Sequence, residues 1–371
     1  MKIAVITARF SFTGVPLAQM RLAEALRRRG AEVDEIFGFI GRANRAIQAG
    51  QGRLDLGASR VIHMLPALVR YLRSRRPDVV FCAEDHLNAI VLVAALLAGS
   101  RARVCCSSRV TPFDTYGRGG LLKRFGFRIL MSTLMKRASL LTCVSQDMVL
   151  QYQHIFGNKG HVCVYNIVDP GLAAERIRAD VSHSWCHEPG RKLIVAAGSL
   201  ERWKGFGDLI HAMTVVRQDA KLLILGEGSQ RRELEALIEN LGLSNRVQLI
   251  GRVDNPLAYF AKAQVFSLSS LVEGMPNVLV EAMMCGCTPV ATNCATGPRE
   301  LLEGGEFGEL VAVGDWVSLG NAINRALERP APAAWLNKVI APFTEQAVLG
   351  RYEELLGIRV WREIPSEGAG Q

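Results

Sequence analysis

The sequence predicts an α/β protein made of two doubly wound, Rossmann-like domains that face each other across a cleft. The chain has 371 residues, which suits two domains of roughly 150 residues each better than one. Short β-branched runs alternate with longer helical patterns, and this alternation occurs in both halves of the chain. Hydrophobic residues make up 49% of the chain and charged residues 21%, so each half can bury its own core.

The first half predicts a parallel sheet with helices on both faces. We expect strands at residues 3–7, 33–37, 78–82, 103–107 and 140–144. A glycine-containing turn at 11–15 leads into a helix at 16–29, which Gly30 ends, and a second helix is expected at 64–75. Strands that point the same way need such helical crossovers, which place helices on both faces of the sheet.

The second half repeats this plan. We expect strands at 193–197, 221–225, 247–250, 265–268 and 288–291, and helices at 207–216, 230–241, 256–262, 277–285 and 317–327. A polar segment at 165–189 interrupts the pattern, so we divide the chain into residues 1–165, 166–345 and 346–371. Ligands of doubly wound sheets bind beyond the carboxyl ends of the strands, which predicts a ligand site in the cleft between the domains.

The two halves differ in charge. Residues 1–165 contain 24 Lys and Arg against 10 Asp and Glu, a net charge of +14, whereas residues 166–371 contain 20 against 25, a net charge of −5. This asymmetry indicates that the first domain faces an anionic partner. Nucleic acid is the weaker candidate, because the chain has no aromatic stacking motif or basic recognition segment, and a lipid surface is the stronger one.

The sequence predicts a cytoplasmic protein without a spanning helix. No long apolar stretch follows a basic start. The longest apolar run, 89–99, is about half as long as the roughly 20 residues that a transmembrane helix needs, so we expect a buried helix there. The nine cysteines have no paired CxxC spacing, which predicts reduced thiols.

The most informative motif places Glu273 and Glu281 on either side of a turn, 274–277, that precedes a helix. Free backbone N–H groups at a helix N-terminus suit a phosphate. Carboxylates accept hydrogen bonds from vicinal sugar hydroxyls, so the motif can hold a sugar, a diphosphate and a ribose together. Taken alone, the spacing also fits a surface glutamate followed by an ordinary helix glutamate.

A second group of polar residues follows the strand at 193–197. Gly198 ends that strand, and Arg202 and Lys204 precede the next helix. Cationic side chains beside a helix N-terminus stabilise the negative charge that grows on a diphosphate as a glycosidic bond breaks. Two solvated loop cations are the other interpretation.

At these segments the sequence resembles the family 4 glycosyltransferases, which are retaining enzymes of the GT-B fold. The resemblance covers nearly all of residues 190–356. Its motifs are Leu222-Leu-Ile-Leu-Gly-Glu-Gly, Gly251-Arg-Val-Asp-Asn-Pro, Glu273-Gly-Met-Pro-Asn-Val-Leu-Val-Glu281 and Gly297-Pro-Arg-Glu300. Asn166 looks like the family's interdomain asparagine, and 343–356 looks like the last helix, which crosses back to the first domain. The branch it resembles builds lipopolysaccharide core, capsule or lipid-linked oligosaccharide.

By position, the resemblance implies a role for each motif residue. Glu281 would bind the ribose of the nucleotide, and Glu273 would hold the hydroxyls of the donor sugar. Arg202 and Lys204 would hold the diphosphate and act in catalysis together with Glu273. Close contacts with the donor would come from Gly14, Gly198, Gly226, Gly274, Met275, Pro276, Asn277 and Val278.

This chain departs from the family pattern at two positions. The family commonly has Gly-Arg where this chain has Gly198 followed by Ser199, so Arg202 must supply the cation from four residues further on. The family often has a histidine after the fourth strand, where this chain has Arg109. His86, expected on a neighbouring loop as a loop or capping residue, lies near it in the fold. We place both His86 and Arg109 on the acceptor side.

No Asp-x-Asp occurs in the chain, whereas metal-dependent transferases use such carboxylates to hold a divalent cation on the diphosphate. We therefore expect no metal and no other cofactor. The resemblance implies retaining transfer of a hexose or N-acetylhexosamine from a nucleotide diphosphate sugar, with UDP favoured, to a lipid-linked or glycan acceptor of the cell envelope. A phosphate oxygen of the leaving group would take the acceptor's proton.

Two other enzyme classes share this architecture. A nucleotide-sugar epimerase or hydrolase would release the sugar rather than transfer it, and acceptor dependence separates the two. A nicotinamide-dependent enzyme fits less well. No G-x-G-x-x-G follows the first strand, and Gly226-Glu-Gly228 is too short for that fingerprint.

Residues 119–137 form a candidate membrane surface. Basic residues alternate there with apolar ones: Lys123, Arg124, Arg128, Lys136 and Arg137 among Leu121, Leu122, Phe125, Phe127, Ile129, Leu130 and Leu134. This pattern suits a helix that lies on anionic lipid, at the cytoplasmic face of the inner membrane. A packed helix with a solvated basic side is the other interpretation.

Overall fold

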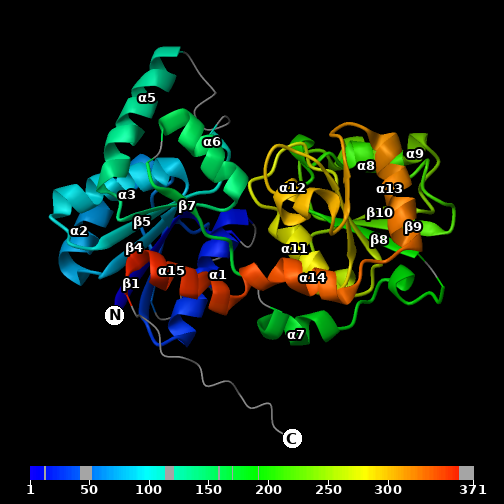
Figure 1. The fold of residues 1–371 in the computed structure, drawn as a ribbon, viewed down its shortest axis with the longest axis horizontal. Coiled ribbons are helices and arrows are strands. Elements are labelled where there is room, and N and C mark those ends of the chain that lie inside the picture. Colours follow the sequence, from blue (N-terminus) through cyan, green and yellow to red (C-terminus); the bar gives the residue numbers. More distant parts are fainter. Residues whose placement is uncertain are drawn as a thin grey trace, which may run out of the picture. The chain divides into compact units, whose positions relative to one another are not determined.

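The computed structural model describes residues 1–11, 14–41, 52–112, 121–157, 159–168, 170–190 and 192–358. The chain forms two compact units (Figure 1). The first unit comprises Met1–Ile167 and the chain from Glu345 onward, and the second comprises Val168–Thr344. Each unit contains one sheet whose strand pairs are all parallel, with helices on both faces, which confirms the predicted fold class.

The first sheet has the strand order β3-β2-β1-β4-β5-β6-β7. Its strands are β1 Lys2–Arg9, β2 Glu32–Phe39, β3 Arg53–Asp55, β4 Val79–Ala83, β5 Arg103–Ser108, β6 Leu140–Cys143 and β7 His161–Cys163. In the middle of the sheet, Ile3 lies opposite Val33 on one side and Val79 on the other. The edge strands β3 and β7 were not predicted, because three residues show too little alternation to identify a strand.

The described helices of the first unit cover both faces of this sheet. They are α1 Gly14–Arg28, α2 Leu65–Arg75, α3 Asp85–Ala98, α5 Leu121–Leu134, α6 Gln146–Phe156 and α15 Glu345–Leu356. Helices α1 and α15 share one face, where Leu26 and Tyr352 pack into the same core as Val5. The helix that begins at Glu345 therefore belongs to the first unit. Its first residue is buried and accepts a hydrogen bond from Arg28 at 2.6 Å.

Helix α3 corrects one expectation. The apolar run at 89–99 was predicted to be a buried helix, and the first turns of α3 are indeed buried. At its C-terminal end, however, the side chains of Leu96 and Leu97 are 56% and 53% exposed. No helix among the described residues is long and apolar enough to cross a membrane.

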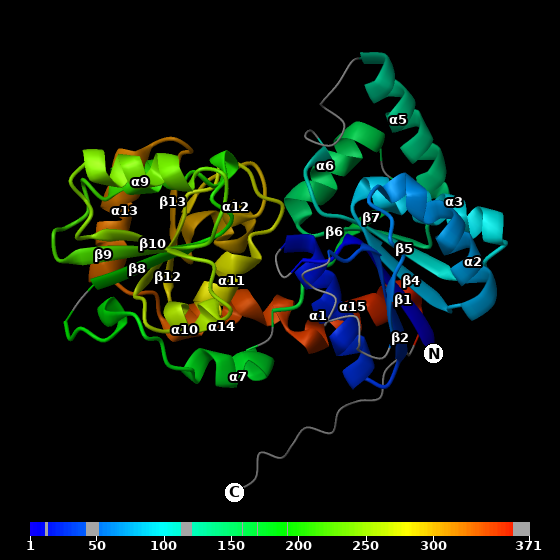
Figure 2. The ribbon, with the colours of Figure 1, turned by 180° about the vertical axis from the view of Figure 1, so that it is seen from behind.

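The second sheet has the strand order β10-β9-β8-β11-β12-β13, seen from behind in Figure 2. Its strands are β8 Lys192–Ala197, β9 Ala220–Leu225, β10 Val247–Gly251, β11 Val265–Leu268, β12 Thr288–Thr292 and β13 Glu309–Val311. The helices are α7 Pro170–Arg178, α8 Phe206–Ala212, α9 Arg231–Asn240, α10 Pro256–Phe260, α11 Asn277–Met284, α12 Pro298–Leu301, α13 Trp316–Glu328 and α14 Ala333–Ile340. The helix predicted at 207–216 ends at Ala212, because the N–H of Met213 already bonds to the carbonyls of both Leu209 and Ile210 in a tightened last turn.

Candidate functional site

The candidate site lies at the carboxyl edge of the second sheet. Strands β8 and β11 are neighbours in the sheet, and the strand order reverses between them: β9 lies beyond β8, and β12 lies beyond β11. Loops that leave a parallel sheet at such a reversal diverge and leave room for a ligand. The loop after β8 contains Lys204, and the loop after β11 contains Glu273.

Lys204 and Glu273 form an ion pair. The Nζ atom of Lys204 lies 2.5 Å from Oε1 of Glu273, and the two side chains are only 18% and 11% exposed. The hydroxyl of Ser270 donates to the same carboxylate oxygen at 2.6 Å. The sequence placed the two charges in one site but gave them separate tasks. The structure shows that they bind each other, and together they present a positive and a negative group at one place.

Hydrogen bonds to the backbone hold these two loops in place. Ser269 Oγ donates to the carbonyl of Lys204 at 2.9 Å, which ties the β11 loop to the β8 loop. The hydroxyl of Thr296 donates to the carbonyl of Glu273 and so attaches the loop after β12 as well. Sequence reasoning did not identify the hydroxyl residues Ser269, Ser270 and Thr296. The only available signal was the position of two serines immediately before the Glu273 motif.

Two glycines bring neighbouring loops into contact. Gly226 has φ 145°, and an added Cβ would lie 1.8 Å from the carbonyl oxygen of Gly198. Gly205 has φ 63°, and an added Cβ would lie 2.0 Å from the carbonyl oxygen of Ser269. At both positions only glycine fits, since such distances exclude any side chain. Gly198 lies directly against the stem of Lys204, so these glycines position the lysine loop.

The turn at 274–277 offers unpaired backbone N–H groups. The N–H of Asn277 bonds to the carbonyl of Met275 at 3.0 Å. The N–H groups of Gly274, Met275 and Val278 donate to no backbone carbonyl among the described residues. Because they surround the N-terminus of α11, these groups are suited to phosphate oxygens.

Glu281 lies on α11, the helix that follows this turn after its N-cap residue Pro276. Its side chain is buried, with 8% exposed. Burial, with a contribution from the negative charge of Glu281, raises the pKa of the Cys285 thiol to about 12. The structure thus places the Glu281 carboxylate about one helical turn after the unpaired N–H groups in the sequence of α11.

Arg202 differs from Lys204. It begins the single 3-10 turn Arg202–Lys204, and its side chain is exposed. Within the described part of the chain, its guanidinium has no hydrogen-bond or ion-pair partner. The lysine is therefore the cation that the structure brings to Glu273.

The predicted acceptor-side residues lie in the first unit. His86 was expected on a loop, but the structure places it in the first turn of α3, exposed, with its ring centroid 4.9 Å from that of Phe127. Arg109 follows β5, and its Nη1 donates to Oδ1 of Asn166. Burial lowers the pKa of the Arg109 guanidinium. Gly14 begins α1 with φ 59°, and the turn residues 12–13 before it lie outside the described residues.

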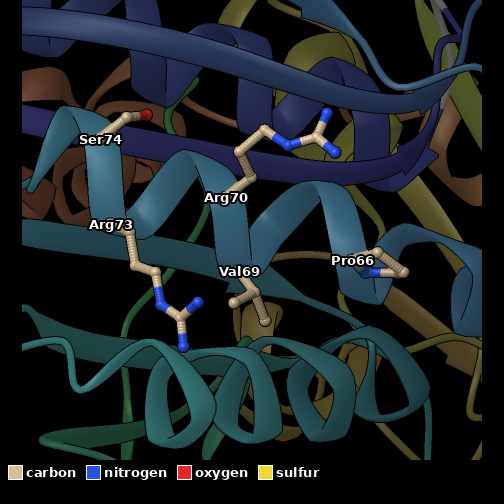
Figure 3. Close-up of a pocket in the computed structure, with 5 residues that line it drawn as sticks. All are labelled: Pro66, Val69, Arg70, Arg73 and Ser74. Carbon is tan, nitrogen blue, oxygen red and sulfur yellow. The ribbon is translucent and has the colours of Figure 1, made fainter.

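A separate open hollow of about 430 Å³ lies on α2 (Figure 3). It is lined by Pro66, Val69, Arg70, Arg73 and Ser74, all from one helix. The hollow contains none of the predicted site residues, so it is not part of the candidate site. In the described ranges, no three His, Cys, Asp or Glu side chains are grouped as metal ligands.

Models of known glycosyltransferase families match both parts of the chain. The family model described as glycosyl transferases group 1 matches residues 180–339. The model described as a glycosyl transferase 4-like domain matches residues 13–166.

Among curated relatives, the N-acetylgalactosamine-N,N'-diacetylbacillosaminyl-diphospho-undecaprenol 4-alpha-N-acetylgalactosaminyltransferase of Campylobacter jejuni is 32% identical over 68% of this chain and 67% of its own length. The lipopolysaccharide core biosynthesis glycosyltransferase LpsD of Rhizobium meliloti is 27% identical over 91% of this chain and 92% of its own length.

Among solved structures, Anabaena HepE in complex with UDP superposes with a TM-score of 0.78 at 20% identity, covering 96% of this chain and all of that chain. The lipopolysaccharide outer core galactosyltransferase WaaB superposes with a TM-score of 0.71 at 18% identity, covering 96% and 99%. These two similarities show the fold. The chain therefore belongs to the group 1 glycosyl transferases, with a glycosyl transferase 4-like first domain and the GT-B fold.

Proposed function

We propose that this glycosyltransferase moves a hexose or N-acetylhexosamine, with retention of configuration, from a UDP-sugar to a lipid-linked or polysaccharide acceptor in cell-envelope glycan synthesis. The observation that carries the proposal is the ion pair between Lys204 and Glu273, together with the N–H groups of Gly274, Met275 and Val278, which donate to no backbone carbonyl among the described residues. Curated relatives are named for undecaprenol-linked and lipopolysaccharide glycans, and HepE is described in complex with UDP and with UDP-glucose, which supports the acceptor and donor classes.

In the proposed mechanism each group has a distinct task. Lys204 and the N–H groups of Gly274 and Met275 bind the diphosphate, and Glu281 binds the ribose. Glu273 accepts hydrogen bonds from the donor sugar. When the donor enters, Lys204 exchanges part of its contact with Glu273 for the phosphate, and the carboxylate is then available to the sugar hydroxyls. Arg202, which is exposed, adds positive charge at the outer side of the diphosphate.

The chemical step forms one bond and breaks one. The acceptor hydroxyl attacks the anomeric carbon from the face that the leaving group occupies, and the bond from that carbon to the phosphate oxygen breaks with its electron pair going to the phosphate. The hydroxyl proton passes to a phosphate oxygen. Lys204 and the N–H groups stabilise the charge that develops on the leaving diphosphate. This proposal needs no metal, and it rests on the missing Asp-x-Asp and on the presence of Lys204.

We also propose that the protein acts at the cytoplasmic face of the inner membrane, where its basic first unit meets anionic lipid. The charge of +14 on residues 1–165 and the exposed apolar side chains of Ile129 and Leu130 on α5 support this. Lys123, Arg124 and the other side chains of 121–125 lie outside the described residues.

The test is UDP release from a panel of UDP-glucose, UDP-N-acetylglucosamine and UDP-N-acetylgalactosamine, with undecaprenyl-diphosphate-linked N-acetylhexosaminides as acceptors, in excess EDTA. The proposal predicts release that depends on the added acceptor, survives chelation and gives an α-linked product. Equal release without acceptor would indicate a hydrolase or epimerase. Complete loss in EDTA that Mg²⁺ or Mn²⁺ restores would overturn the metal-free mechanism.

A further inference from the structure

The carboxyl edge of the first sheet contains a second group of charged residues. Arg9 ends β1, Glu84 follows β4 and Arg109 follows β5. Strands β1 and β4 are neighbours, and the strand order reverses between them, because β2 lies beyond β1 and β5 lies beyond β4. Glu84 thus lies at the switch point of the first sheet, the position where doubly wound sheets bind ligands.

The backbone of Glu84 is strained. Its φ is 81° and its ψ is 128°, a conformation that suits glycine and that L side chains rarely adopt. Three hydrogen bonds hold it there. The N–H of Glu84 donates to the carbonyl of Ser107 at 3.0 Å, its carbonyl accepts the N–H of Asn88 at 2.8 Å, and the Asn88 side chain also donates to Ser107 at 3.0 Å.

The next residue is also held firmly. Asp85 is buried and accepts hydrogen bonds from the hydroxyl of Ser108 at 2.6 Å and from the hydroxyl of Tyr152 at 2.7 Å. The surrounding structure therefore enforces a backbone conformation that a glycine would adopt without strain. A purely structural role would not require a glutamate at this position.

The side chain of Glu84 is partly buried, yet its carboxylate has no hydrogen-bond partner among the described residues. Burial raises its pKa, and the positive charges of Arg109 and Arg9 oppose this rise, whereas the neighbouring Asp85 adds to it. The Nε atom of Arg109 is buried and likewise lacks an acceptor in the described part of the chain. At the same edge of the sheet, the Glu84 carboxylate and Arg109 Nε thus lack hydrogen-bond partners among the described residues, which is costly unless a ligand uses them.

We propose that Glu84 and Arg109 bind the acceptor sugar. The carboxylate of Glu84 accepts a hydrogen bond from a sugar hydroxyl, and the guanidinium of Arg109 donates to an oxygen of the same sugar, either a hydroxyl or the carbonyl of an acetamido group. This inference rests on the proposed function, because only a transferase needs a second sugar.

The test measures binding of p-nitrophenyl α-N-acetylgalactosaminide by saturation-transfer NMR, in the presence of UDP. Glu84→Gln keeps the size of the side chain but removes its charge, and it should weaken sugar binding about 10- to 100-fold. The control is Glu32→Gln, an exposed carboxylate at the start of β2, on the opposite edge of the same sheet, which should bind like the parent.

A second variant separates a binding role from a structural one. Glu84→Gly relieves the backbone strain and should raise or leave unchanged the Tm while sugar binding is lost. Parent-like sugar binding by Glu84→Gln, a clear fall in the Tm of Glu84→Gly, or no sugar binding by the parent would each overturn the inference. UDP binding, measured in the same samples, should be equal in all four proteins. Its absence from the parent would contradict the donor site and not the role of Glu84.

Discussion

Among single residues, Lys204 is the one whose surroundings define its role most closely. It is nearly buried, its stem passes Gly198, and its ammonium contacts Glu273 at 2.5 Å. In the mechanism that we propose, a cation held in this way is already oriented when the diphosphate binds, so its binding energy can act on the charge that develops during bond breaking.

We predict that Lys204→Ala lowers kcat by about 100- to 1000-fold, or roughly 2.7–4 kcal/mol, with a smaller effect on donor affinity. Steady-state kinetics with saturating acceptor and calorimetry with donor separate the two quantities. Lys262→Ala, which removes an exposed lysine from the same unit, is the matched control. A large loss of affinity with unchanged turnover would mean that Lys204 only holds the ground state.

His161 makes stability depend on pH. Both ring nitrogens are buried without hydrogen-bond partners among the described residues, and burial lowers the pKa of His161 from 6.5 to about 4. In the unfolded chain His161 therefore binds a proton below about pH 6.5, whereas in the folded chain it binds one only below about pH 4. The free energy of unfolding falls as the pH drops through this window.

We predict that His161→Leu abolishes this part of the pH dependence. Because of His161, the free energy of unfolding of the parent should be about 2 kcal/mol lower at about pH 5 than at neutral pH. The variant should not show this loss. Urea unfolding at a series of pH values measures the difference. Parallel curves for the two proteins would show that His161 is not the group responsible.

At the scale of secondary-structure elements, close contacts between the loops of the second sheet set the geometry of the site. The carbonyl of Gly198 occupies the space that a side chain on Gly226 would need. We predict that Gly226→Ala lowers the free energy of unfolding by at least roughly 3 kcal/mol and weakens donor binding.

Gly207 provides the matched control. It lies in the first turn of α8, and an added Cβ would meet nothing within 4 Å. Gly207→Ala should therefore stabilise the protein by about 0.5–1 kcal/mol, because alanine loses less conformational freedom in a helix. Chemical denaturation measures the free energy of unfolding of both variants. Equal values for Gly226→Ala and Gly207→Ala would mean that the loop after β9 can shift away from Gly198.

Helix α5 exposes apolar side chains, which is why we propose that it meets lipid. Figures 1 and 2 show it extending beyond the rest of its own unit. Ile129 and Leu130 are 51% and 49% exposed. Arg128 instead donates to the carbonyl of Ile155, and its guanidinium lies 6.0 Å from the centre of the Phe156 ring, so it helps to pack α5 on α6. Exposed basic residues at the end of this segment, and not Arg128, are the better probes of lipid binding.

We predict that the double variant Lys136→Glu, Arg137→Glu loses most binding to vesicles that contain phosphatidylglycerol. Each basic residue near an anionic surface contributes about 1 kcal/mol, so removing two should weaken binding by at least roughly 2 kcal/mol. Arg232→Glu, Arg329→Glu removes two exposed arginines from the second unit and is the control. If the parent fails to sediment with such vesicles at low salt, α5 is an ordinary packed helix.

For the whole molecule, the sequence predicted the two sheets and the order of most elements, because the central strands are short, mostly buried runs that alternate with longer helical patterns. It could not predict the short edge strands β3, β7 and β13, since three residues contain too little pattern. Predicted ranges also missed where some helices end, as at Ala212, because a tightened turn depends on local hydrogen bonds and not on hydrophobic spacing.

The sequence identified individual residues of the candidate site but not which of them contact each other. Glu273, Glu281 and Lys204 were identified from motifs around glycine turns, and the structure adds that Lys204 and Glu273 contact each other. That pairing depends on the order of β8 and β11 in the sheet, which no local pattern encodes. The backbone strain at Glu84 could not be predicted either. Its φ of 81° depends on hydrogen bonds to residues on β5 and α3, which no local sequence pattern encodes.

The measurement that tests the central claim most directly is calorimetric titration of UDP into the parent and into Glu281→Ala. Glu281 lies on α11, about one helical turn after the N–H groups that are proposed to hold the diphosphate, and its replacement removes the proposed partner of the ribose but leaves those N–H groups in place. The account predicts that the parent binds UDP and that Glu281→Ala binds it more weakly by roughly 1.5–3 kcal/mol, with a similar Tm. The exposed carboxylate of Glu239, on α9, supplies the control, and Glu239→Ala should bind like the parent. UDP binding by Glu281→Ala that equals that of the parent would contradict the placement of the donor site.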